Sequence, residues 1–143
     1  TNMPQVYIES FIKYHQLKNI RIVVGKSGEE YYNYLNCADV FFLSSRQDPF
    51  PLVMLEAAYL NKYIVGLNSG GVTEFINEDM GHVINSWNID DIAAELDMCC
   101  KKINDNSTAG KAKDAASKYD AKRQAKLFEE LLLSACKEIK VNP

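Results

Sequence analysis

Two carboxylates, Asp48 and Glu56, stand eight positions apart in the stretch SSRQDPFPLVMLEAA, residues 44–58. If a helix begins near Pro49 or Pro51, every residue three or four positions from Glu56 is apolar or aromatic, so no polar face surrounds this acid. A charge buried among such side chains costs several kcal/mol unless it has partners. We therefore expect Glu56 to accept hydrogen bonds from backbone groups, from Arg46 or from hydroxyls of a bound ligand.

Asp48 precedes the same predicted helix, where its side chain could simply cap free backbone N–H groups. Taken together with Glu56, it could instead bind a second hydroxyl-bearing group of one extended ligand. The helix N-terminus between the two acids would suit a phosphate, because its N–H groups are unpaired and carry partial positive charge. A sugar joined to a nucleoside through phosphates has this layout.

Strands and helices alternate along the chain, and this pattern predicts an α/β fold. The predicted strands are apolar or β-branched runs at residues 19–25, 39–45, 62–67 and 82–85. The predicted helices lie at residues 3–17, 29–38, 48–61 and 90–103, with a short helix after the glycines at 70–71 and a terminal helix from residue 120. We expect a Rossmann-like parallel sheet flanked by helices, in a single domain over residues 1–143.

The terminal helix has a start signal and an apolar face of its own. Asp120 could cap it, after a loop NDNSTAG at residues 104–110. Its apolar stripe consists of Phe128, Leu131, Leu132, Ala135 and Ile139.

Three loops follow predicted strands, and ligands of open parallel sheets bind beyond such strand ends. Their sequences are GKSGEE, SSRQDPFP and NSGG. Gly70 and Gly71 in the third loop would allow a ligand to approach the backbone closely, although a plain tight turn also explains a double glycine.

Composition excludes several classes of function. A net charge of -3 gives no basic surface for nucleic acid. The four cysteines form no CxxC pair and neither histidine is near them in sequence, so a zinc site is not expected and a reduced, cytoplasmic setting is. No apolar run approaches the roughly 20 residues that span a bilayer, and the start TNMPQVYIES lacks a signal-peptide pattern.

The segment ADVFFLSSRQDPFPLVMLEAAYLNKYIVGLNSGGVTEFI resembles the donor-binding signature of the family-four retaining glycosyltransferases of GT-B fold, the glycosyl transferases group 1. In that family a first acid and a glutamate eight positions later bind the donor sugar and the ribose. Asp48 and Glu56 hold these places. The resemblance extends from about Asn19 through HVINSWNIDDIA to YDAKRQAKLFEELL near the C-terminus.

The resemblance implies a role for each matching position. Asp48 would bind donor-sugar hydroxyls, Glu56 the ribose, and the loop around Lys26 would lie near the base. The implied donor-binding residues are Gly25, Lys26, Asp48, Pro49, Phe50, Pro51, Leu52, Val53, Glu56, Gly70 and Gly71. Two departures stand out: Asp replaces the commoner Glu at the first acid, and prolines stand at positions 49 and 51 where glycines are frequent. Pro51 has no N–H to offer a phosphate.

The resemblance also implies parts that this chain lacks. They are an N-terminal acceptor domain, the first strands of the donor-binding half, and an Arg and Lys pair that neutralises the donor diphosphate. Without that charge we expect no catalysis by this chain alone, and we assign it no catalytic residue. The expected partners are a UDP-, GDP- or ADP-linked sugar and the absent domain, through which the protein could lie at the inner membrane face. No metal or other cofactor is expected, and exposed sheet edges could pair two copies of the chain.

Two other interpretations remain beside the enzyme. A non-catalytic nucleotide-sugar-binding or scaffold module would use the same site. A phospho-receiver domain would need an aspartate at the end of a central strand, where this chain has LSSR. A serine hydrolase is disfavoured because Ser44 and Ser45 lack the GxSxG elbow.

Overall fold

The computed structural model describes residues 5–103 and 110–139, with side chains as far as residue 136. Contacts between residues divide the chain into two compact units, Thr1–Tyr32 and Asn33–Pro143. Each unit is described by itself. The sheet and the loops that follow its strands belong to the second unit.

The first unit contains helix α1 (Gln5–Tyr14), a connecting segment and the first turns of α2 (Gly28–Asn36). The predicted strand at residues 19–25 is wrong, because this segment has no regular secondary structure. Its Val23 and Val24 are 41% and 58% exposed. A β-branched run forms a strand only where a neighbouring strand takes its backbone hydrogen bonds and a core takes its side chains. The described part of this unit contains no strand for it to pair with.

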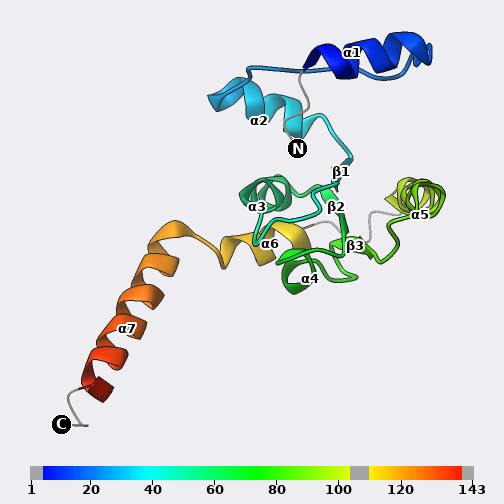
Figure 1. The fold of residues 1–143 in the computed structure, drawn as a ribbon. Helices are drawn as coiled ribbons and strands as arrows, with labels where there is room; N and C mark the ends of the chain where they lie inside the picture. Colours follow the sequence, from blue (N-terminus) through cyan, green and yellow to red (C-terminus); the bar gives the residue numbers. More distant parts are fainter. Residues whose placement is uncertain (1–4, 104–109, 140–143) are drawn as a thin grey trace. The chain divides into compact units, whose positions relative to one another are not determined.

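The second unit is built on a parallel sheet with strand order β1-β2-β3 (Figure 1). The strands are β1 (Val40–Leu43), β2 (Tyr63–Leu67) and β3 (Gly81–Ile84). In register, Leu43 lies opposite Gly66, and Leu67 lies opposite Ile84. All three carboxyl ends therefore meet at one edge of the sheet, as the sequence predicted for the last three strands.

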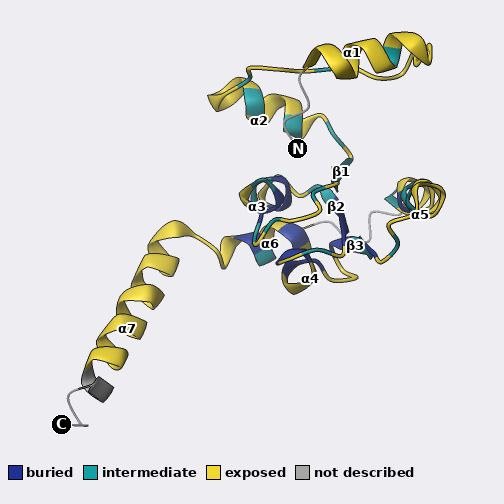
Figure 2. Ribbon diagram, in the orientation of Figure 1, coloured by how far each residue is buried: buried dark blue, intermediate teal, exposed yellow. Residues whose placement is uncertain are grey.

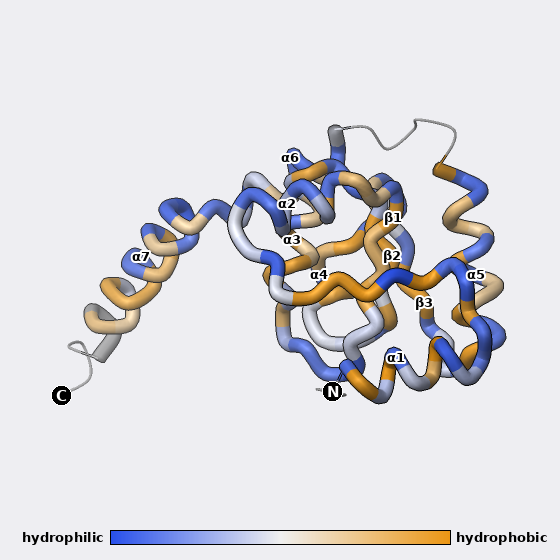
Figure 3. The backbone as a smooth tube through the Cα atoms, turned by 90° about the horizontal axis from the view of Figure 1, so that it is seen from above, coloured by the Kyte–Doolittle hydropathy of each residue, from blue (hydrophilic) through white to orange (hydrophobic). Residues whose placement is uncertain are grey.

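Helices cover both faces of this sheet. Alternate residues of β2 point to opposite faces: Ile64 joins a core with α3 (Leu52–Tyr59), α4 (Val72–Phe75) and α6 (Lys111–Ser117), whereas Val65 joins a core with α5 (Ile89–Lys102). Figure 2 shows the buried residues concentrated in α3, α4, α6 and the strands, and Figure 3 shows the hydrophobic colour along β1 and β2. The predicted α/β architecture is confirmed.

Helix α6 is the one described element that the hydrophobic pattern did not predict. Its buried residues are Ala112 and Ala116, which share a core with Met54 and Ala58 of α3. Two alanines make too short an apolar pattern to indicate a helix from sequence. The helix begins after Gly110, whose N–H donates to Asn61 Oδ1 at 2.8 Å. Residues 104–109 of the predicted loop lie outside the described residues.

Helix α7 (Ala121–Ile139) begins where the sequence predicted. Asp120 caps it, because the N–H groups of Lys122 and Arg123 donate to its carboxylate at 3.0 and 3.3 Å. The predicted apolar stripe is exposed as far as its side chains are described: Phe128 is 62% and Leu131 64% exposed (Figure 2). Over the described residues, no helix is both long and apolar enough to cross a membrane.

The close packing of α6 on α3 predicts a cost for any larger side chain at position 112. We expect Ala112→Leu to lower the free energy of unfolding by about 1–3 kcal/mol, because the added atoms overpack a fully formed core. Ala125→Leu on exposed α7 is the control and should change it by less than about 0.5 kcal/mol. Urea unfolding followed by circular dichroism measures both. Equal effects of the two substitutions would contradict this packing.

Candidate functional site

Three loops leave the carboxyl edge of the sheet and form the candidate site. They are residues 44–51 after β1, 68–71 after β2 and 85–88 after β3. The first two carry the acid and the glycines that the sequence singled out. We call them the acidic loop (44–51) and the glycine loop (68–71).

The glycine loop packs directly on the backbone of the acidic loop. The Gly71 N–H donates to the Pro49 carbonyl oxygen at 2.7 Å. A Cβ at Gly70, whose φ is +52°, would lie 2.0 Å from the Asp48 carbonyl oxygen, and a Cβ at Gly71 would lie 2.4 Å from that of Pro49. Any side chain there would collide with backbone. The double glycine is therefore required by contact between the two loops, whether or not a ligand is bound.

Further contacts hold the acidic loop from both sides. The Ser69 hydroxyl donates to the Arg46 carbonyl oxygen at 2.6 Å. The Phe50 ring stacks on Tyr119 with 5.2 Å between centroids and meets Phe75 of α4 edge-on at 6.2 Å. Such aromatic pairs add to the energy of burial. Phe50 thus anchors the loop with its side chain, and only its backbone remains for the role that the resemblance implies.

Asp48 is half-buried and does not cap α3. That cap position belongs to Pro51, which forms no side-chain hydrogen bond, and α3 begins at Leu52. The alternative role considered for Asp48 is therefore wrong, because the two prolines carry the chain past it before the helix starts. The first N–H groups of a helix have no intrahelical partner, and here they belong to Leu52 and Val53.

Glu56 lies in the second turn of α3 and is half-buried. Its apolar neighbours in the sequence indicated a buried acid, whereas the structure leaves it partly exposed; no charged residue within the described ranges is fully buried. The reason is geometric: α3 turns Met54, Ala57 and Ala58 into the core, whereas Leu52 and Tyr59, which lie near Glu56 on the helix, are 70% and 56% exposed. An apolar neighbourhood in sequence does not reveal which of those residues face solvent.

Gly25 and Lys26 lie in the first unit, between α1 and α2. Gly25 has a φ of +69°, and the Lys26 ammonium pairs with the Glu30 carboxylate one turn later. Their expected place near a nucleobase stays a prediction.

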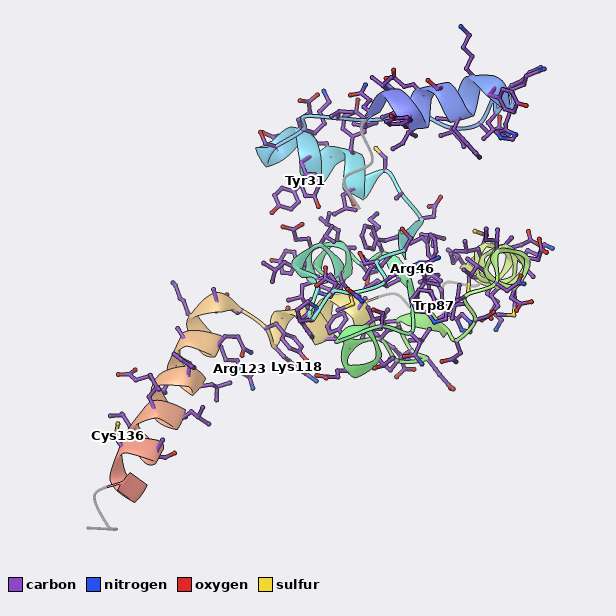
Figure 4. All side chains as sticks on the ribbon, in the orientation of Figure 1. Tyr31, Arg46, Trp87, Lys118, Arg123 and Cys136 are labelled. Atoms are coloured by element: carbon purple, nitrogen blue, oxygen red, sulfur yellow. The ribbon has the colours of Figure 1, made fainter. Side chains whose placement is uncertain are left out.

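The structure adds a third loop that sequence reasoning did not include. The guanidinium of Arg46 lies over the ring of Trp87, with Cζ 5.4 Å from the centroid (Figure 4). Asn68 also joins two loops, since its side-chain amide donates to Asn85 Oδ1 at 2.7 Å. The sequence did contain one indication of this third loop, because Trp87 is the single tryptophan of the chain and follows the last predicted strand.

The groups with displaced pKa values lie away from this edge. Burial raises the pKa of Cys99 on α5 and of Tyr63 at the start of β2, so both remain protonated over the neutral range. His82 Nε2 lies 2.6 Å from Glu95 Oε2 and ties β3 to α5. These contacts are structural. Across the described ranges, no group of three or more His, Cys, Asp or Glu side chains is placed to hold a metal ion.

Because the two loops are in contact, we expect Gly70→Ala to lower the stability of the fold by more than the strain of its positive φ alone would. Gly110→Ala is the matched control, because Gly110 also has a positive φ, of +90°, but its Cβ would meet nothing within 4 Å. Strain at positive φ costs about 1–3 kcal/mol at either position, and only Gly70→Ala adds a backbone collision. Thermal unfolding should therefore show a larger loss for Gly70→Ala. Equal losses would show that the loops are not in close contact.

Comparison with known proteins identifies the fold and the family of the chain. Sucrose-phosphate synthase from Thermosynechococcus elongatus has a similar structure, with a TM-score of 0.72 at 19% sequence identity over 90% of this chain. This chain spans 34% of that enzyme, and the likeness confirms the predicted fold, a Rossmann-like fragment of the GT-B type. No curated protein matches the chain. The family model for glycosyl transferases group 1 matches residues 2–119, well over half of the sequence. The chain therefore belongs to the glycosyl transferases group 1.

Proposed function

We propose that this chain is the donor-binding part of a retaining, family-four glycosyltransferase, which transfers a sugar from a nucleoside diphosphate sugar to an acceptor. Membership of the glycosyl transferases group 1 supports a transferase. The observation that carries the proposal is the contact of the acidic and glycine loops at the carboxyl edge of the sheet, through the Gly71 to Pro49 hydrogen bond. Parallel sheets bind their ligands at such an edge.

Asp48 and Glu56 bind hydroxyl groups on two different parts of the donor. The Asp48 carboxylate accepts hydrogen bonds from the donor sugar, and Glu56 accepts them from the ribose. Both acids are half-buried, so each is partly exposed at this edge and partly shielded from competing water. Between them, the N–H groups of Leu52 and Val53 at the start of α3 face the diphosphate, whereas Pro51 contributes none.

The rest of the enzyme supplies what these residues do not. We propose that a separate N-terminal domain binds the acceptor, and that an Arg and a Lys from the start of the donor-binding half neutralise the departing diphosphate. The reaction is metal-independent, as the resemblance implies, and this chain alone binds the donor without turning it over. Pairing of two chains through the sheet edges formed by β1 and β3 stays a prediction, which light scattering would test.

Ligand-observed NMR tests the assignment of the two acids. The chain should bind a UDP-, GDP- or ADP-linked sugar weakly, and this binding should be abolished by Glu56→Ala and reduced by Asp48→Ala. Asp97→Ala is the control, because Asp97 lies exposed on α5 and pairs with Lys101. Equal binding by the parent and by all three variants would refute the site.

Removal of a ribose hydroxyl separates a direct contact of Glu56 from an effect on folding. The parent should bind the ribonucleoside diphosphate about tenfold more tightly than its 2′-deoxy form, because a hydrogen bond to a charged group is lost. Glu56→Ala should bind both forms alike. A persisting preference in Glu56→Ala, measured by titration with the same two ligands, would place the ribose elsewhere.

A further inference from the structure

A single cation and a single acid occupy the three loops at the carboxyl edge of the sheet. Residues 44–51, 68–71 and 85–88 contain one basic residue, Arg46, and one acidic residue, Asp48. The Asp48 carboxylate has a role in the proposed function, whereas Arg46 has none. Its placement therefore needs its own explanation.

Arg46 is held both at its backbone and at the guanidinium end of its side chain. Its carbonyl oxygen accepts the hydrogen bond from Ser69, which ties its backbone to the glycine loop. Its guanidinium lies over the Trp87 ring, whose own loop is fixed because Asn88 caps α5 at 2.8 Å and Ser86 donates to Asp91 at 2.6 Å (Figure 4). A rotamer-rich side chain is thus ordered before any ligand arrives, which lowers the entropy that binding must remove.

The stacked arrangement leaves the charge of Arg46 unneutralised. A guanidinium that lies over an aromatic face keeps its N–H donors, because the ring attracts the cation without accepting conventional hydrogen bonds. Within the described ranges no carboxylate lies at ion-pair distance from Arg46. Trp87 is 44% exposed, so the pair is open to solvent at this edge. The site therefore offers a fixed fork of donors suited to phosphate oxygens.

We propose that Arg46, positioned by Trp87, binds the diphosphate of the donor and supplies positive charge from within this chain. The inference rests on the proposed function, and it assigns to the loops after β1 and β3 a role that the two acids do not cover. Arg46 reaches the phosphate oxygens as a bidentate donor, and Trp87 acts as a positioning residue.

Isothermal titration with a nucleoside, its diphosphate and inorganic pyrophosphate tests this role. Arg46→Met keeps the apolar stem and removes the charge. It should weaken binding of the diphosphate about tenfold or more and leave binding of the nucleoside unchanged, because charge-assisted hydrogen bonds are lost. Trp87→Leu keeps Arg46 but removes its support, so a smaller loss confined to the diphosphate is expected. Arg123→Met on α7 is the control and should bind like the parent.

The outcomes distinguish this inference from the proposed function. If the diphosphate sugar binds in a manner that depends on Asp48 and Glu56 while Arg46→Met binds it as the parent does, only the role of Arg46 is overturned. If no nucleotide binds but pyrophosphate binds to the parent and is lost in Arg46→Met, the anion site stands and the proposed function fails. Absence of binding by every probe overturns both. Unchanged thermal unfolding of each variant shows that a loss reflects the site and not the fold.

Discussion

Direct contact of backbone with backbone between the glycine loop and the acidic loop is the constraint that organises the site. Gly70 and Gly71 approach the Asp48 and Pro49 carbonyl oxygens so closely that no side chain fits between them. Two hydrogen bonds, from Gly71 to Pro49 and from Ser69 to Arg46, join the loops. Because the loops follow neighbouring parallel strands, this contact sets where Asp48 and the start of α3 lie relative to β2. The ring contacts among Phe50, Phe75 and Tyr119 also hold the acidic loop in place.

The features that the sequence predicted correctly are those encoded locally. The runs at 39–45, 62–67 and 82–85 correspond to β1, β2 and β3 to within two residues, Asp120 caps α7, and the glycines mark a loop. Each of these features depends on side-chain periodicity or turn chemistry over a few residues. The sequence-based predictions failed where contacts with residues distant in the sequence determine the local structure or the burial of a side chain. Residues 19–25 have strand composition without a neighbouring strand, and Glu56 is half-buried because the core selects a different side of α3. The meeting of Arg46 with Trp87 spans two crossovers, which no local pattern encodes.

The three loops at the carboxyl edge of the sheet carry no net charge of their own. The chain carries a net charge of -3, yet the three loops balance one acid with one base. A diphosphate needs more positive charge than one arginine to leave readily, since catalysis of such a step depends above all on electrostatic stabilisation of the leaving group. We propose that this chain recognises the donor and orders its phosphates, and that the remaining charge comes from the Arg and Lys at the start of the donor-binding half. Binding and turnover are then properties of different parts of one enzyme.

If the donor binds as proposed, it lies against the contact of the acidic and glycine loops. Protein-observed NMR of the ¹⁵N-labelled chain, during titration with a nucleoside diphosphate sugar, reports on this placement amide by amide. We expect the largest amide shifts on Leu52, Val53, Gly70 and Gly71, with smaller shifts along α5. Shifts concentrated on α5 or α7, with the amides of Leu52, Val53, Gly70 and Gly71 unmoved under saturating ligand, would contradict it.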